Sequence, residues 1–173
     1  QPRIHLEEAR GAIGIPEHKI FKLGDKSNFW PSNAKQNGPN GPCGPCSEIF
    51  FDYDPSDPAV PKDPDDIAGR FTEVWNLVFT QFNRKDGGIL EPLPSKNIDT
   101  GMGLERLCSV MQGVKNNFET DLFAPVITAI EREIPGNLSV EEQRIIADHV
   151  RAATFAISDG IIPSNKERGS VVK

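Results

Sequence analysis

The residues with the clearest potential for chemistry lie between positions 97 and 112. The first part of this stretch alternates like a β-strand, so Asp99, Gly101 and Gly103 should share one face. A carboxylate there can bind an ammonium group, and two positions without side chains let a flat ligand or another backbone come close. Arg106 follows in the first turn of a predicted helix, where its guanidinium can bind an anion. These residue types predict a site for a ligand that carries both charges.

The period of the sequence changes after Gly103. Leu104, Leu107, Cys108 and Met111 have helical spacing and form one apolar stripe, which predicts a helix. A buried strand–helix junction, with glycines that serve only close packing, explains the same spacing as well as a ligand site does.

Residues 71–83 form the strongest predicted strand, because β-branched and aromatic residues dominate them. Alternation puts Asn76 and Val78 on one face, and an amide within an apolar face needs a partner or a ligand. Both faces are largely apolar, so we expect an interior strand covered on both sides. The Asp-Gly-Gly turn within residues 84–88 then predicts a hairpin that leads into the strand of Asp99.

Residues 28–48 are dense in Gly, Pro and Asn and predict an irregular but ordered loop. The loop contains Trp30 and the pair Cys43 and Cys46, which has the spacing of half a zinc site. No second Cys or His pair follows, so no structural zinc is expected.

Further elements are predicted on both sides of these motifs. Residues 20–23 and 47–53 have the composition of strands, whereas the Asp- and Pro-rich residues 54–69 are typical of a surface insertion. Predicted helices cover residues 5–12, 120–134 and 139–158, and the last begins with the capping-box pattern Ser139-x-x-Glu142. Strands joined by a tight turn and followed by helices favour an α+β fold with an antiparallel sheet.

Composition limits the class of protein further. The chain has 173 residues, 37% hydrophobic and 25% charged, with a net charge of −6. No apolar run reaches the roughly 20 residues of a membrane span, and the first residues lack the apolar core of a signal peptide, so a cytoplasmic protein is expected. The negative charge disfavours binding of nucleic acid mainly through phosphates. Three cysteines form no paired framework, which suits a reduced compartment.

Several motifs resemble the alanyl-tRNA synthetase family of class II aminoacyl-tRNA synthetases. GMGLER is similar to motif 3 of the class, and the preceding Asp99-Thr100 is similar to the alanyl version in particular. Together with GMGLER, the motifs NFW, GPCGPCSEIFFD, WNLVFTQFNR and ADHVRAATFAISDGIIPSN occur along the chain in family order, so the resemblance covers residues 28–168. The final RGSVVK departs from the usual RGYVLRR, because Ser170 replaces the tyrosine and Lys173 the first arginine.

The resemblance implies a class II antiparallel sheet with flanking helices. Residues 1–135 would be the C-terminal part of the catalytic domain, and residues 136–173 the start of the helical tRNA-recognition domain. The implied reaction is ATP-dependent activation of alanine to alanyl-adenylate, followed by transfer to the 3′ end of tRNA(Ala). ATP and Mg²⁺ would serve as cofactors, and alanine, ATP and the acceptor stem of tRNA(Ala) as partners. The family's motifs 1 and 2 are absent from this sequence, so the chain alone is expected to be inactive.

The resemblance also implies roles for individual residues. Those that would bind alanine are Trp30, Asn76, Val78, Asp99 and Gly101. Those that would bind ATP are Gly101, Gly103 and Arg106, and the catalytic pair would be Arg106 and Asp99. Asn165 would contact the acceptor stem of the tRNA.

Alternatives remain at several of these positions. Trp30 could instead anchor a core beneath the loop, and Asn165 could be a turn residue. Glu73-x-x-Asn76 resembles an acid-x-x-polar magnesium pair, but an unbulged strand would point the two residues to opposite faces, so Glu73 is not among the predicted site residues. A non-catalytic relative that binds tRNA or protein is the alternative function. A free-standing editing hydrolase is disfavoured, because the histidines form no H-x-x-x-H pair.

Overall fold

The structure is a computed structural model that describes residues 14–59, 61–134, 136 and 138–173. The chain folds into two compact units, Gln1–Leu107 and Cys108–Lys173. The predicted helix over residues 5–12 lies outside the described residues. The predicted division at residues 135 and 136 concerns functional domains rather than compact units, and it stays a prediction.

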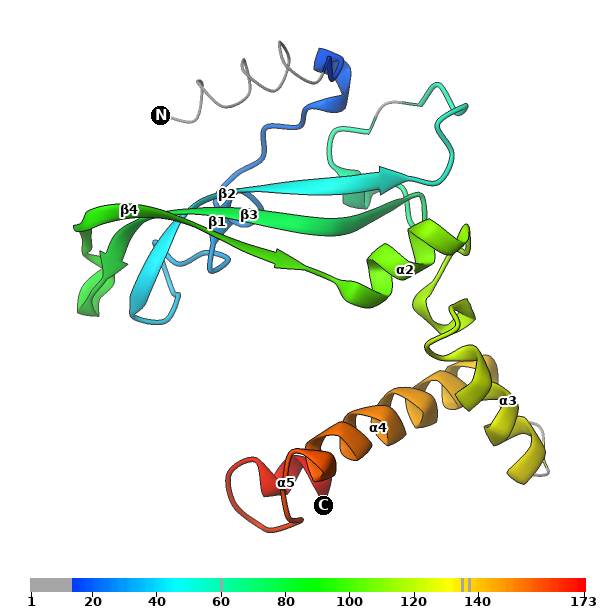
Figure 1. Cartoon of the computed structure of the whole chain (residues 1–173). Coiled ribbons are helices and arrows are strands. Elements are labelled where there is room, and N and C mark those ends of the chain that lie inside the picture. Colours follow the sequence, from blue (N-terminus) through cyan, green and yellow to red (C-terminus); the bar gives the residue numbers. More distant parts are fainter. Residues whose placement is uncertain (1–13, 60, 135, 137) are drawn as a thin grey trace. The chain divides into compact units, whose positions relative to one another are not determined.

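The first unit is built on a four-stranded antiparallel sheet in the order β1-β2-β3-β4 (Figure 1). The strands are β1 (Phe29–Trp30), β2 (Gly41–Asp52), β3 (Phe71–Arg84) and β4 (Leu90–Met102). Each strand neighbours the next one in sequence, as the predicted hairpin requires. The sheet and the helices that follow it confirm the predicted α+β fold.

β2 corrects the prediction of a loop over residues 28–48. Its strand begins at Gly41 and includes both Gly-Pro-Cys repeats. The pairing with β3 shifts between Cys43 and Cys46, and this irregularity accommodates the prolines. A Cβ added at Gly44 would lie 2.0 Å from the carbonyl oxygen of Phe79. Only glycine therefore allows the two backbones to approach this closely.

β3 and β4 form the predicted hairpin, joined by the short 3₁₀ helix η3 (Asp86–Gly88). β4 is one continuous strand, and β3 is its neighbour in the sheet. β4 ends at Met102, and helix α2 (Leu104–Gln112) begins two residues later, as the change of period predicted.

The regions beside β2 differ partly from prediction. Residues 20–23 form no strand, and the 3₁₀ helix η1 (Glu17–Lys19) precedes them. The insertion at residues 54–69 contains the 3₁₀ helix η2 (Pro64–Asp66). Arg70 fastens it to the sheet, because its guanidinium donates to both carboxylate oxygens of Asp52 at 2.8 and 3.0 Å and to the Ala59 carbonyl oxygen at 3.0 Å.

The second unit is helical. It contains the 3₁₀ helix η4 (Asn117–Glu119), α3 (Ala124–Glu133), α4 (Val140–Ser158) and the short α5 (Gly169–Val172), which was not predicted. α4 begins with the predicted capping box, in which Ser139 and Glu142 each bond to the other's backbone N–H. The core of the second unit consists of Phe123, Ile130 and Ala147, packed against partly buried hydrophobic neighbours.

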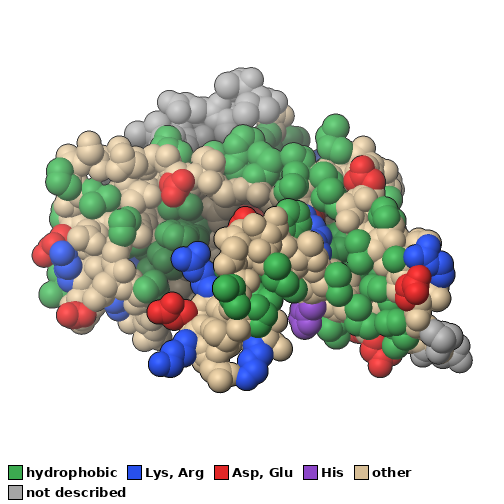
Figure 2. All heavy atoms as spheres, turned by 60° about the horizontal axis from the view of Figure 1, so that its bottom comes forward, with side chains coloured by type: hydrophobic (Ala, Val, Ile, Leu, Met, Phe, Trp, Pro, Cys, Tyr) green, Lys and Arg blue, Asp and Glu red, His purple; other side chains and the backbone are tan. Residues whose placement is uncertain are grey.

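Burial is less complete than the apolar patterns predicted. Within the described part of β3, only Val78 and Arg84 are buried, so the strand is interior within the sheet but is not covered on both faces. Leu104 and Met111, two members of the predicted stripe on α2, are 57% and 77% exposed. Figure 2 shows hydrophobic side chains at many places on the face in view, with charged side chains scattered among them. None of the described helices has the length and apolar character needed to cross a bilayer.

Candidate active site

Two adjacent rows of side chains cross the sheet and bring four of the predicted site residues together. Residues directly opposite in neighbouring antiparallel strands point to the same face, and so do residues two apart in one strand. The first row crosses β2, β3 and β4 through Glu48, Asn76 and Gly101. The second crosses the same strands through Cys46, Val78 and Asp99. The predicted residues Asn76, Val78, Asp99 and Gly101 thus occupy neighbouring positions on one face.

Asn76 is held from the β2 side. Its Nδ2 donates to Oε1 of Glu48 at 3.1 Å, whereas its Oδ1 is buried and has no hydrogen-bond partner among the described residues. Cys46 lies next to this amide, and its thiol donates to the Ser27 carbonyl oxygen at 3.3 Å. Burial, with a smaller contribution from the Glu48 carboxylate, raises the pKa of Cys46 to about 11. The thiol therefore stays protonated and neutral at physiological pH.

Asp99 and Gly101 form the open side of the rows. The Asp99 side chain is exposed, and its Oδ1 accepts a hydrogen bond from the Thr100 N–H at 2.9 Å, which restricts the carboxylate. A Cβ added at Gly101 would meet nothing within 4 Å. The carboxylate is thus reachable beside unfilled space, as binding of an ammonium group requires.

Gly103 has a different use, because the Arg106 side chain fills the space above it. A Cβ at Gly103 would lie 3.2 Å from Cδ of Arg106. Nη1 of Arg106 donates to Oε2 of Glu73 at 2.9 Å and to the Glu73 carbonyl oxygen at 3.1 Å. The glycine therefore gives room to the arginine stem, and the guanidinium is held against β3.

Glu73 lies beside the predicted site residues, although it was not predicted to be one of them. An unbulged strand would point Glu73 and Asn76 to opposite faces, but the pairing shifts by one residue between Ile49–Trp75 and Phe50–Glu73. The extra residue, Val74, breaks the alternation between Glu73 and Asn76. The carboxylate of Glu73 reaches Arg106 and also raises the pKa of Cys46, in the second row. The only signal in the sequence was the Glu73-x-x-Asn76 pattern itself.

The other two predicted residues lie outside the two rows. Trp30 pairs with Gly44 at the β1 side of the sheet and is 48% exposed, so it is not the buried core anchor that the alternative required. Its neighbour Phe29 is the buried residue of that strand. Asn165 belongs to the second unit, where its exposed side chain accepts a hydrogen bond from Lys173.

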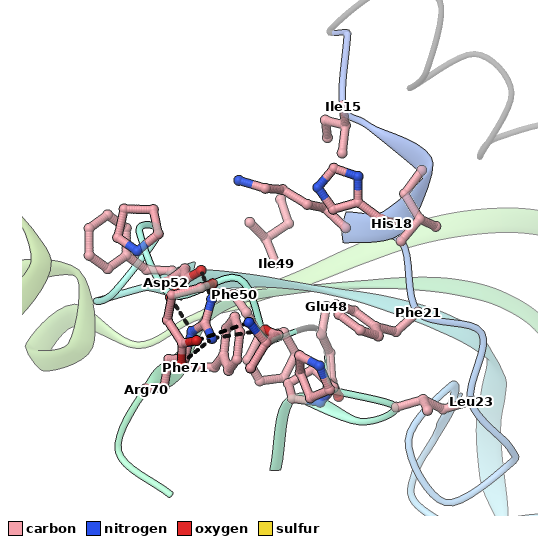
Figure 3. A pocket seen from close by; sticks show the side chains of 18 of the residues that line it. Ile15, His18, Phe21, Leu23, Glu48, Ile49, Phe50, Asp52, Arg70 and Phe71 are labelled. Atoms are coloured by element: carbon pink, nitrogen blue, oxygen red, sulfur yellow. Dashed lines mark hydrogen bonds and ion pairs between the residues drawn. The ribbon is translucent and has the colours of Figure 1, made fainter. Parts of the chain in front are cut away.

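A cavity of about 740 Å³ lies beside β2, between the segment Ile15–Leu23 and the insertion (Figure 3). Figure 3 shows the ion pair of Asp52 and Arg70 at one end of it. Arg70 holds the pKa of the Asp52 carboxyl below its ordinary value through this pair. None of the predicted site residues lines the cavity; Glu48 does, and it is also in contact with Asn76.

Comparison with known proteins decides the family. The family described as tRNA synthetases class II (A) matches residues 8–173. The chain belongs to this class II synthetase family. Curated relatives named alanine–tRNA ligase include the protein of Thermotoga sp. (strain RQ2), 49% identical over 166 residues and 93% of this chain. Those of Geobacillus kaustophilus and Idiomarina loihiensis are 48% and 47% identical, over 95% and 93% of this chain.

This synthetase chain spans a small part of each relative. The matched region covers 19% of the Thermotoga and Geobacillus ligases and 18% of the Idiomarina ligase. The family and the sheet of the first unit agree with the resemblance in GMGLER and WNLVFTQFNR.

Proposed function

We propose that this chain is part of an alanine–tRNA ligase that activates alanine with ATP and transfers it to the 3′ end of tRNA(Ala). The observation that carries the proposal is the pair of rows on one face of the sheet, with Asn76 and Val78 beside Asp99 and Gly101. An exposed carboxylate, a buried amide oxygen and a small apolar wall match the ammonium and methyl groups of alanine.

Residues of the two rows bind different groups of alanine. Asp99 pairs with the α-ammonium, and such a charge-assisted hydrogen bond fixes the orientation of the amino acid. Val78 and Trp30 close the space around the methyl group, and Asn76 hydrogen-bonds the substrate. Gly101 leaves room for the bound alanyl group, since a Cβ added there would meet nothing within 4 Å beyond its own chain neighbours.

Arg106 binds the phosphates of ATP that leave as pyrophosphate. In the structure its guanidinium is paired with Glu73, so a phosphate has to replace that carboxylate or share the guanidinium with it. Both side chains of this pair are partly exposed, so replacing the Glu73 carboxylate by a phosphate costs little free energy. Gly103 contributes by leaving space for the stem of the arginine.

Glu48 and Glu73 supply oxygen atoms of the kind that Mg²⁺ prefers, and Glu73 is the residue that we expect to hold the ion. Mg²⁺ neutralises charge on the phosphates when it is bound. The protein's own part is to position alanine and ATP and to stabilise the developing charge.

Asn165 contacts the acceptor stem of tRNA(Ala) in this proposal. The domain division at residues 135 and 136 assigns it to the tRNA-recognition part. Free thiols at all three cysteines suit a cytoplasmic site of action.

The test is alanine-dependent exchange of pyrophosphate into ATP by the full-length protein that contains this chain. Exchange should be strongest with alanine, weaker by about 10- to 200-fold with glycine, and absent with valine, because one methyl group gives only limited discrimination. Serine serves as a further comparison. Absence of exchange with every amino acid, from a folded full-length protein, would overturn the proposal and favour a non-catalytic binding module.

A further inference from the structure

Glu48 lies in the same row as Asn76 and Gly101 but is not among the residues proposed to bind alanine. It stands directly opposite Asn76, which in turn stands opposite Gly101. Its Oε1 accepts the hydrogen bond from Nδ2 of Asn76 at 3.1 Å. The contact joins two strands within the sheet, so it constrains the amide from one side.

The chemistry of the pair decides which way the amide faces. An ionised carboxylate can only accept hydrogen bonds, and an asparagine amide has an NH₂ donor on one side and a carbonyl acceptor on the other. Glu48 therefore holds Nδ2 toward β2. Oδ1 must then face away from the carboxylate of Glu48.

The amide oxygen of Asn76 has no donor of its own. It is buried, and no described residue donates a hydrogen bond to it. Buried acceptors without a donor are rare in native proteins and costly, because the group has lost water and gained nothing. A bound donor that satisfies this atom would recover that cost.

We propose that Glu48 is a positioning residue, which fixes the amide of Asn76 so that Oδ1 accepts a hydrogen bond from the α-ammonium of alanine. The inference rests on the proposed function, since it assigns a task within that site. Asp99 supplies the charge that attracts the ammonium, and the oriented amide supplies a second acceptor. Without Glu48 the amide can turn and offer its NH₂ group, which repels an ammonium.

The experiment is a set of variants in the full-length enzyme, with alanine and ATP varied separately in pyrophosphate exchange. Glu48→Gln should raise the KM for alanine about tenfold, the equivalent of one lost hydrogen bond, and leave the KM for ATP nearly unchanged. Glu91→Gln is the matched control, because Glu91 is exposed on β4 and pairs only loosely with Lys85 at 3.7 Å. It should change neither constant.

A reciprocal exchange separates positioning from a merely structural contact. Asn76→Asp alone places two carboxylates against each other and should reduce kcat/KM for alanine by about 100-fold. The double variant Glu48→Gln with Asn76→Asp restores a donor on β2 and an acceptor on β3. It should recover at least tenfold of that loss.

Three results would overturn the inference. These are an unchanged KM for alanine in Glu48→Gln, an effect on the KM for ATP instead, and a double variant no better than Asn76→Asp. Each leaves the proposed function intact as long as the wild-type enzyme exchanges with alanine. Failure of the wild-type enzyme would overturn the proposed function itself, and this inference with it.

Discussion

Asp99 is the residue whose charge the proposed site depends on most. Its carboxylate is exposed beside open space at Gly101 and is restrained by the Thr100 N–H. Asp99→Asn keeps the shape but removes the charge, and a hydrogen bond to a charged group is worth about 1.5–3 kcal/mol. Alanine-dependent exchange in the full-length enzyme should therefore fall by about 10- to 100-fold in kcat/KM.

The control for Asp99 is Asp148→Asn, an equal change at an exposed position of α4. It should leave alanine activation unchanged. An unchanged kcat/KM in Asp99→Asn would remove Asp99 from the ammonium role.

Cys46 makes stability depend on pH in the alkaline range. The folded protein keeps the thiol protonated up to about pH 11, whereas the unfolded chain releases the proton near the ordinary value of 9.0. The unfolded state thus loses its proton first as the pH rises, so the free energy of unfolding should decrease between pH 9 and 11. Cys46→Ala should flatten this decrease in urea unfolding measured across the range.

Equal slopes for Cys46→Ala and the wild type would contradict the proposed origin of the effect.

Single residues were predictable where a simple period placed them. Alternation predicted that Asn76 and Val78 share a face of β3, and that Asp99 and Gly101 share a face of β4. The pairing of the two strands shows that these residues lie side by side. Glu73 was not predicted as a site residue, because its position depends on a β-bulge and no residue type in the sequence marks that bulge. The contact between Glu48 and Asn76 could not be predicted, because the two residues lie 28 positions apart in the sequence.

Among the elements, α4 depends most visibly on its first residue. Ser139 accepts a hydrogen bond from the Glu142 N–H, and the Ser139 hydroxyl and N–H both donate to the Glu142 carboxylate. Ser139→Ala should lower the free energy of unfolding by about 1 kcal/mol in urea titrations followed by circular dichroism. Ser158→Ala, at the other end of the same helix, should have little effect.

The same cap should respond to acid. Its hydrogen bonds hold the pKa of Glu142 below the ordinary value of 4.5, so its contribution is present above that pH and is lost as the pH falls through the lowered pKa. The difference between wild type and Ser139→Ala should shrink in that acidic range. A constant difference at all pH values would show that the carboxylate takes no part.

Elements with a strong local signal were predictable, and those held by distant contacts were not. The capping box, the Asp-Gly-Gly hairpin and the change of period before α2 all depend on neighbours in sequence. Residues 41–48 carry the composition of a loop, yet they are strand because Gly44 lets β2 approach the Phe79 carbonyl. The strand expected over residues 20–23 did not form, since a short apolar run does not specify a pairing partner.

At the scale of the whole chain, we expect activity to be limited by how little of the related ligases the chain spans. It spans 19% of the Thermotoga ligase, so most of that ligase has no counterpart in these 173 residues. The purified 173-residue chain should form no alanyl-tRNA above background, whereas the full-length protein should do so under the same conditions. Turnover by the chain alone would contradict the prediction.

Family and fold class were predictable at this scale, because several motifs occur in order along nearly the whole chain. The boundary between the two compact units, at residue 107, was not predicted, whereas the functional division at residues 135 and 136 stays a prediction. α2 spans the boundary between the compact units, and no local pattern in a continuous helix indicates where one unit ends.

β4 pairs with β3 along one side, and no other described strand pairs with it. In such a strand the backbone N–H groups point alternately to the neighbour and outward. Deuterium uptake from Asn97 to Met102 in the 173-residue chain should therefore be slow and fast at alternate residues. Uniform uptake would contradict the pairing, and slow exchange at both sets in the full-length protein would identify this edge as the place where the sheet continues.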